Sequence, residues 1–550
     1  MTVRRFVLSS AVPLTAVLIM TAGCSDSGPA AARVDPPRAS GGGPPTTPPP
    51  TGGGMVKEGW FGGADGLHAR VEIKGVERQA TRSVLRLTLT PLASATPSAG
   101  ATGGTASPPG GAGTTMSFAV SLLDPVGRRL YRPLTGGQPS QLAVGAAQEM
   151  TVEYPPLPQD VQRVTVITPG TAGEFAGVPV TAGTGTGPGT GTGTGAGTGF
   201  GVGVGTVPTG TTPTPSPTGT ASPSTTATAS PGGGATDLYG ITEGEVRDVT
   251  SGPADETLSL RADVLFDSGS DKPSARAKQV LDQAAADLQR NVSATDRAIA
   301  IDGHTDGAGN ESQNLDLSRR RAQAVEKELK NRLGGTFRYT ATGKGKADPV
   351  AKEGGSGDAA ARARNRRVEI SYKVRQGPGS GTTTSTPSTT PSASASVSPS
   401  PPATPGTFRA QDGTTVASRT GQFGQAKRRL NVKPFYRDGA YLVAVFEIVN
   451  EGPGNTPPDA SYPHQDYPGG AFTAFSVSAP GGKDVYRAVR IGAAAPGAYA
   501  SYVDPGRATF RTGVGQPARG FVYLPAPPGN VRTVTFNAGL FGKVDNVPVN

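Results

Sequence analysis

The sequence predicts a multidomain chain in which a central α+β sandwich is flanked by two small antiparallel β-sandwich domains, joined by disordered Gly/Thr/Pro/Ser linkers. The chain has 550 residues with 80 glycines, 52 prolines and only 35% hydrophobic residues, which is typical of small cores separated by low-complexity stretches. Residues 55–182 and 406–550 alternate apolar and polar positions with period two, which indicates strands. Residues 255–375 mix strand and helix periods in the order β-α-β-α-β-β.

Residues 1–24 have the layout of a lipoprotein signal peptide. Arg4 and Arg5 precede an apolar run that ends at Met20, and the ending "TAGC" resembles a bacterial lipobox. The alternative is an ordinary secretory signal followed by a free thiol. We favour acylation of Cys24 because the only cysteine of the chain falls there, and two or more acyl chains anchor a protein stably to a membrane. The expected location is the outer face of the cell membrane, in contact with the cell wall.

Three stretches cannot bury a core, because Gly, Pro, Thr, Ser and Ala make up most of their residues, namely residues 25–54, 183–234 and 376–405. We predict a disordered tether over residues 25–54 and disordered linkers over residues 183–254 and 376–405. Residues 93–114 have a similar composition and are expected to loop out between two strands.

The two flanking regions are predicted to be built alike. In residues 55–182, "LHARVEIKGV", "SVLRLTLTPL" and "DVQRVTVITP" read as strands, and Asp124-Pro125-Val126-Gly127 reads as a hairpin turn. Tyr154 and Tyr523 each precede a V-x-x-V-T segment and a Val-Pro-Val ending. We interpret residues 406–550 as a distant duplicate of residues 55–182. The alternative is two unrelated β domains that share generic alternation.

The central region predicts four strands and two helices in sequence order. A strand over "TLSLRADVLF" is followed by a helix that Pro273 opens, because proline suits the first turn of a helix. "AIAIDGH", "RYTATGKG" and "RRVEISYKV" are the other strands, and "NLDLSRRRAQAVEKELKNRL" is the second helix. The apolar faces of the two helices are predicted to be Ala277, Val280, Leu281, Ala284 and Leu288, and Ala322, Val325, Leu329 and Leu333.

One opposite-charge pair stands out in this region. Asp306 lies in a Gly-rich turn after a strand, and Arg321 lies fifteen residues later on a helix, where Asn314, Leu317 and Arg321 share one face. If the two charges are held apart, they can clamp a ligand that carries both an ammonium and a carboxylate, with Asp306 accepting the ammonium and Arg321 the carboxylate. The alternative is a purely structural salt bridge between them.

The motifs of the central region resemble the OmpA-like peptidoglycan-binding domain family over a little over a fifth of the chain. They are "VLFDSGSDKPSARAKQVLDQAAADL", "IDGHTDGAGNESQNLDLSRRRAQAV", "TGKGKADPV" and "ARARNRRVEI", of which the second is the most specific. The resemblance implies non-covalent binding of the diaminopimelate in a peptidoglycan stem peptide. It also implies supporting roles near the pocket for Asp267, Thr305, Asn314 and Leu317.

Catalysis, metal binding and nucleic-acid binding are not expected. His304 lies next to Asp306, but neighbouring side chains on a strand point to opposite faces, and three histidines with one cysteine do not make a metal set. The run Arg319-Arg320-Arg321 has no aromatic residues interleaved for base stacking, so Arg319 and Arg320 are expected to form a solvated face. No cofactor is expected.

The predicted function is therefore a non-catalytic lipoprotein that tethers the membrane to the cell wall. Its predicted partners are the lipid bilayer and peptidoglycan of the diaminopimelate type, and a net charge of +10 favours anionic partners in general. The alternative function makes the β-sandwich domains a recruiting module for a protein or a glycan, which the central domain only anchors to the wall.

Overall fold

The computed structural model describes one compact unit within residues 54–550. The described residues are 54–61, 67–92, 120–134, 143–183, 234–355, 357–375, 403–456, 460–494, 499–506 and 513–550. Cys24, the predicted signal peptide, all but the last residue of the predicted tether and the insertion 93–114 lie outside them. Most of the two predicted linkers also lies outside them.

The N-terminal part of the unit is built from two antiparallel sets of strands. The first set is β1-β2-β3-β6 and the second is β5-β4-β7-β8, and the end of β8 also pairs in parallel with the end of β2. The turn predicted at residues 124–127 is confirmed, because Asp124 Oδ1 accepts the backbone N–H groups of Val126 and Gly127 between β4 and β5. The strand bounds are β1 Met55–Phe61, β2 Leu67–Arg78, β3 Ser83–Pro91, β4 Ser121–Asp124, β5 Arg129–Tyr131, β6 Gln148–Tyr154, β7 Arg163–Ile167 and β8 Glu174–Ala182.

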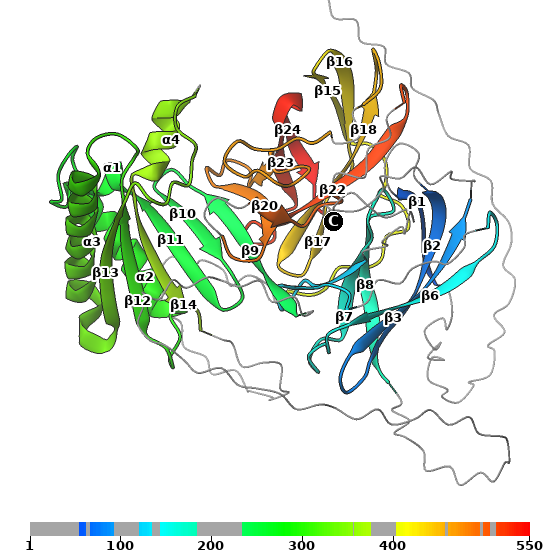
Figure 1. Ribbon diagram of the computed structural model, residues 1–550, viewed down its shortest axis with the longest axis horizontal. Helices are drawn as coiled ribbons and strands as arrows, with labels where there is room; N and C mark the ends of the chain where they lie inside the picture. Colours follow the sequence, from blue (N-terminus) through cyan, green and yellow to red (C-terminus); the bar gives the residue numbers. More distant parts are fainter. Residues whose placement is uncertain are drawn as a thin grey trace, which may run out of the picture. The chain divides into compact units, whose positions relative to one another are not determined.

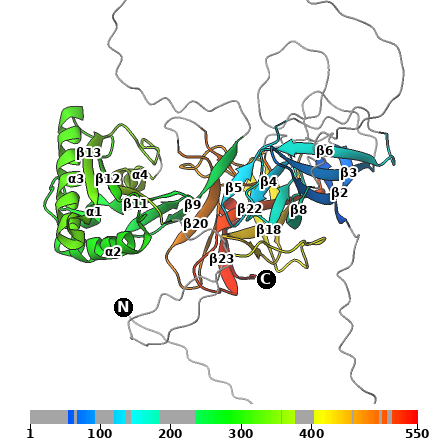
Figure 2. The ribbon, with the colours of Figure 1, turned by 90° about the horizontal axis from the view of Figure 1, so that it is seen from below.

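The central part is an α/β unit with a mixed sheet in the order β9-β10-β11-β14-β12-β13 (Figure 1). Only β12 and β13 run parallel. Helices α2 and α3 contact one another and lie along this sheet (Figure 2). The bounds are β9 Ala235–Glu243, β10 Arg247–Ser251, β11 Asp255–Arg261, α1 Ala262–Leu265, α2 Ala275–Asn291, β12 Ala298–His304, α3 Glu311–Leu333, β13 Arg338–Gly345, α4 Asp358–Asn365 and β14 Arg367–Lys373.

The two long helices begin at capping residues and bury the faces that their sequences predict. Ser274 Oγ accepts the N–H of Ala277 at the start of α2, and Asn310 Oδ1 accepts the N–H of Ser312 at the start of α3. Every residue of the two predicted apolar faces is buried in one core. Within the part of the chain that the structure describes, no helix is long and apolar enough for a membrane crossing.

Three predicted boundaries in this part were wrong. The strand predicted through Phe266 ends at Arg261, because residues 262–265 turn into α1. Pro273 does not open α2, because Ser274 takes the N-cap position and the proline comes before it. The third error is the linker predicted over residues 183–254.

Residues 235–251 of that predicted linker form β9 and β10. β9 pairs with β5 through Ala235–Asp237, with β20 through residues 238–243 and with β10 through residues 240–243 (Figure 2). The segment contains charged residues, which residues 183–234 lack, so composition already marks a boundary near residue 235. β9 and β10 pair with each other locally, whereas β5 and β20 pair with β9 from distant parts of the sequence, which a local pattern cannot show.

The C-terminal part contains a five-stranded sheet and a second group of strands. In the five-stranded sheet β15, β16, β18 and β22 pair in that order, and β17 also pairs with β18. β19 pairs with β20 and β23, β20 with β21, and β23 with β24. The bounds are β15 Ala417–Phe423, β16 Ala426–Val432, β17 Tyr436–Asp438, β18 Tyr441–Asn450, β19 Phe475–Ser478, β20 Val485–Ile491, β21 Ser501–Tyr502, β22 Pro517–Pro525, β23 Thr533–Ala538 and β24 Lys543–Pro548.

The predicted duplication pairs β6-β7-β8 with β22-β23-β24, and it stays a prediction. The two β regions also contact one another. Leu123, Leu130 and Ala176 belong to one buried cluster with Tyr441, Phe521 and other residues of the C-terminal part. Arg519 of β22 also pairs with Glu174 of β8 at 2.7 Å. Each region thus has a hydrophobic core of its own, and a third buried cluster joins the two regions.

Candidate functional site

The end of strand β12 packs directly against helix α3 and so fixes where the charged residues lie. A Cβ atom on Gly303 would lie 2.0 Å from the carbonyl oxygen of Ser318, and one on Gly343 would lie 2.6 Å from the backbone nitrogen of Arg319. The Ser318 hydroxyl accepts the N–H of Gly345 at 2.9 Å. These contacts hold α3 against the ends of β12 and β13, with Arg321 three residues beyond Ser318.

Arg321 is buried, with a side chain only 4% exposed, although the sequence pattern placed it beside the core. Its guanidinium carbon lies 5.3 Å from the ring centroid of Phe266, and its Nε donates to the carbonyl of Ser270 at 2.9 Å. The side chain therefore lies against Phe266 and the loop between α1 and α2. Burial lowers its pKa, and nearby carboxylates offset this only in part.

No described residue forms an ion pair with Arg321 or accepts a hydrogen bond from its two Nη atoms. Asp306, its predicted counterpart, is instead paired with Arg366, whose Nη1 donates to Asp306 Oδ2 at 2.6 Å. The structural salt bridge between Asp306 and Arg321 that we considered as an alternative is thus not formed.

Arg366 is the partner of Asp306 that the sequence did not predict. Besides Asp306, it holds Asp263 through two hydrogen bonds of 2.8 and 2.7 Å. The hydrogen bonds that Arg366 donates to Asp263 and Asp306 raise the pKa of Arg366. The site thus contains two guanidinium groups, of which only one has carboxylate partners. The signal was the run "RARNRR", whose arginines we left without roles.

The loop that carries Asp306 is braced from two sides. Asn314 Nδ2 donates to the carbonyl of Ala308 at 2.7 Å, which ties the loop to the first turn of α3. On the other side, the Glu353 carboxylate accepts the N–H of Gly307 at 3.0 Å and the amide of the buried Asn365 at 2.6 Å. Helix α4, which the sequence analysis did not predict, positions Asn365 and so completes this bracing.

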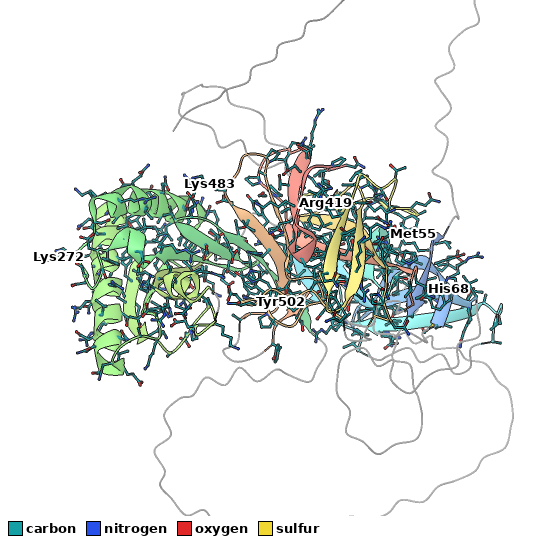
Figure 3. The ribbon with its side chains drawn as sticks, turned by 90° about the horizontal axis from the view of Figure 1, so that it is seen from above. Met55, His68, Lys272, Arg419, Lys483 and Tyr502 are labelled. Carbon is teal, nitrogen blue, oxygen red and sulfur yellow. The ribbon has the colours of Figure 1, made fainter. Side chains whose placement is uncertain are left out.

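The remaining predicted residues lie around the same loops. Thr305 is buried, its N–H donates to the Gly345 carbonyl at 2.9 Å, and its hydroxyl has no hydrogen-bond partner among the described residues. Asp267 is exposed in the loop that also carries Ser270, and Lys272 marks the surface end of that loop (Figure 3). Leu317 is half-buried one turn before Arg321. The roles of all six predicted residues stay predictions.

A family model described as "OmpA family" matches residues 265–366, the range that contains the loops, Asp306, Arg321 and Arg366. Residues 265–366 form an OmpA-like peptidoglycan-binding domain. The resemblance seen in the sequence is thereby confirmed, and the OmpA-like domain is a non-catalytic module.

Individual relatives match less than a fifth of the chain. Outer membrane protein A of Shimwellia blattae is 33% identical over 93 residues, which are 17% of this chain and 38% of that protein. Outer membrane protein A of Klebsiella aerogenes is 34% identical over 95 residues, 17% of this chain and 27% of that protein. The chain thus spans well under half the length of these relatives.

Two solved structures are similar to the same part of the chain. One is the cell wall anchor of the T6SS from Pseudomonas aeruginosa, with 29% identity, a TM-score of 0.21, and coverage of 23% of this chain and 87% of that one. The other is the peptidoglycan-associated lipoprotein from Burkholderia pseudomallei, with 31% identity, a TM-score of 0.17, and coverage of 20% and 86%.

His304 of the OmpA-like domain belongs to a buried group of charged side chains that does not include Asp306. Its Nε2 lies 3.6 Å from Glu369 Oε2, and Arg367 Nε donates to Glu369 Oε1 at 2.7 Å. Burial raises the pKa of Glu369, but His304 and Arg367 outweigh it and bring this pKa to about 2. His304 and Asp306 therefore have different carboxylate or guanidinium partners and do not form a catalytic pair.

Replacing Glu369 by Gln is expected to destabilise the chain at neutral pH by about 1–3 kcal/mol, because Arg367 loses a carboxylate partner. A pKa of about 2 lies below the ordinary value of 4.5, so the stabilisation is fully present above pH 4.5 and is lost as the pH falls toward 2. Urea unfolding of both chains between pH 7 and pH 2.5 tests this. A stability difference that does not shrink with falling pH would contradict it.

No group of three or more metal-ligating side chains occurs in the ranges that the structure describes. A cavity of about 270 Å³ exists in the central unit, but it lies at the opposite end of β12 from Asp306. It is lined by Ser293, Arg297, Phe337 and Arg375 among others.

The exposed Arg319 and Arg320 both form ion pairs with Asp316, as expected for a solvated face.

Proposed function

We propose that the protein binds peptidoglycan non-covalently by clamping the free end of a stem-peptide diaminopimelate between Asp306 and Arg321. The observation that carries this is the unpaired guanidinium of Arg321. A buried cation without a carboxylate partner is costly, and a ligand carboxylate is the group that relieves this cost. The two Nη atoms of Arg321 suit a two-pronged bond to such a carboxylate.

The ammonium of the ligand takes the second position at Asp306. This carboxylate is 17% exposed, and Arg366 Nη1 engages its Oδ2 while Oδ1 faces the N–H of Ala308 at 3.3 Å. A carboxylate has about four acceptor positions, so Asp306 can accept an ammonium without releasing Arg366. Arg366 then holds Asp306 in place as a positioning residue.

The energies suit a polymer target. Hydrogen bonds to charged groups contribute roughly 1.5–3 kcal/mol each, so two such contacts give a weak-to-moderate site. The cell wall repeats its stem peptides at high density, and rebinding to neighbouring copies compensates for weak individual contacts. The described structure thus supports retention on the wall.

Co-sedimentation of the chain with purified sacculi tests this function. The unchanged chain should pellet with sacculi that contain diaminopimelate, and Arg321→Gln and Asp306→Asn should each weaken binding about 10- to 150-fold, the equivalent of 1.5–3 kcal/mol. Arg320→Gln and Asp282→Asn are matched controls, because both side chains are exposed and engaged only in surface ion pairs. Equal pelleting of all five chains, with unchanged thermal midpoints, would contradict the proposal.

A second arm compares two kinds of wall. Sacculi with lysine in place of diaminopimelate lack the side-chain carboxylate, so Arg321 stays unpaired, at a cost of roughly 1–3 kcal/mol. Binding should fall about 5- to 150-fold for the unchanged chain. The Arg321→Gln chain should show little preference between the two walls.

We propose further that acylated Cys24 ties the chain to the membrane, so that the protein joins membrane and wall in the cell envelope. The sequence supports this through the signal-like residues 1–24 and their "TAGC" ending. Two or three acyl chains are sufficient for stable anchoring. The intact mass of the chain isolated from membranes, compared with that of Cys24→Ser, tests for the lipid.

A further inference from the structure

A second cavity, of about 400 Å³, lies in the C-terminal part, far in sequence from the OmpA-like domain. Its walls come from Arg437 on β17, from the turn residues Asn530 and Arg532, and from Pro548 and Asn550 at the end of β24. The N–H of Phe435 donates to Pro548, the N–H of Asn550 donates to Phe435, and the N–H of Val549 donates to Arg532, each at 2.8–2.9 Å. The end of the chain therefore lies beside β17 (Figure 1), and backbone bonds fix the walls.

Arg437 is a partly buried cation without an anionic partner. Its Nη2 donates to the carbonyl of Gly529 at 3.0 Å, whereas its Nε is buried and has no hydrogen-bond partner among the described residues. Burial lowers the pKa of Arg437, and no carboxylate offsets this. The adjacent Asp438 is engaged elsewhere, because it accepts hydrogen bonds from Thr165 and Tyr523 at 2.7 and 2.8 Å.

Arg532 adds a second cation to the same cavity. Its side chain is exposed and forms no ion pair with any described carboxylate. Asn550 also lines the cavity. Asn530 contributes an amide that can donate further hydrogen bonds.

We propose that this cavity is a binding site for an oxyanion group, a carboxylate or a phosphate, held between Arg437 and Arg532. Guanidinium groups bind both kinds of anion with two parallel hydrogen bonds. A volume of about 400 Å³ is in the range of small-molecule sites, so the ligand is a small anionic molecule or the anionic end group of a polymer. The proposal is independent of peptidoglycan binding by the OmpA-like domain.

The test is an NMR titration of the full chain with inorganic phosphate and, separately, with acetate at constant ionic strength. Saturable shifts of the Asn530 and Asn550 amide signals are expected with at least one anion. The tighter-binding anion identifies the ligand class. Arg437→Gln and Arg532→Gln should each weaken binding at least about tenfold, and Arg532→Gln keeps the test valid if Arg437→Gln unfolds, because Arg532 is exposed.

Two variants serve as controls. Arg419→Gln removes an exposed arginine of β15 in the same part of the chain (Figure 3), which donates only to backbone carbonyls, and it should bind the anions as the unchanged chain does. Arg321→Gln should also leave the titration unchanged, which separates this site from the proposed clamp. Absence of saturable shifts, or equal binding by Arg532→Gln and the unchanged chain, overturns the proposal.

Discussion

Replacing Arg519 by Gln is expected to lower the free energy of unfolding by about 3–5 kcal/mol, because the change leaves a buried carboxylate without its main partner. The Arg519 guanidinium donates to both oxygens of Glu174, at 2.9 and 2.7 Å, and to both oxygens of Asp412, at 2.6 and 2.8 Å. Glu174 is 2% exposed. Burial would raise the pKa of Glu174, but Arg519 and Lys57 outweigh burial and lower it.

Urea unfolding at pH 7 measures the effect. The matched control is Arg70→Gln, because Arg70 pairs with Glu58 at 2.8 Å while both side chains are about half exposed. An exposed pair of this kind contributes about 0–1 kcal/mol. If the two substitutions lowered stability equally, the network around Arg519 would not stabilise the contact between the two β regions.

Replacing Gly303 by Ala is expected to lower stability by about 1–3 kcal/mol and to weaken sacculus binding as well. The added Cβ would lie 2.0 Å from the Ser318 carbonyl oxygen, which is a backbone atom and cannot rotate away. Helix α3 must therefore shift away from β12. This shift displaces Arg321, which lies one turn after Ser318 on the helix. Binding should fall at least about tenfold, or 1.4 kcal/mol, even in molecules that stay folded.

Gly335→Ala is the control for that substitution. Gly335 follows α3, and a Cβ there would have no heavy atom within 4 Å. The Gly335→Ala chain should have the higher thermal midpoint and should bind sacculi more strongly than the Gly303→Ala chain. Normal binding by a folded Gly303→Ala chain would mean that the contact between β12 and α3 does not position Arg321.

Local sequence patterns predicted the central fold well. The helix faces of α2 and α3 and the strands β12, β13 and β14 follow from periodicity, because each buries its apolar positions in one core. Periodicity could not predict α4 or β9. α4 has eight residues rich in arginine and alanine, and β9 pairs with β5 and β20, two strands that are distant in the sequence, as well as with the neighbouring β10.

The candidate site was predicted in part. Spacing and motif identified Asp306 and Arg321, and Asn314 lies where it can brace the loop. The direction of the Arg321 side chain and the partner of Asp306 depend on Phe266 and Arg366. Both reach the site through tertiary packing from distant parts of the sequence, which no spacing rule encodes.

The pairing of β9 with β5 also limits how strongly the number of residues between 183 and 234 can affect the free energy of folding. Gly183 donates to the Arg78 carbonyl at 2.7 Å, and β9 begins beside β5, so both ends of that segment are attached to the same unit. Doubling the length of a closed loop changes its closure free energy by only about 0.6 kcal/mol. Insertions and deletions between Gly183 and β9 are thus expected to change the free energy of folding little.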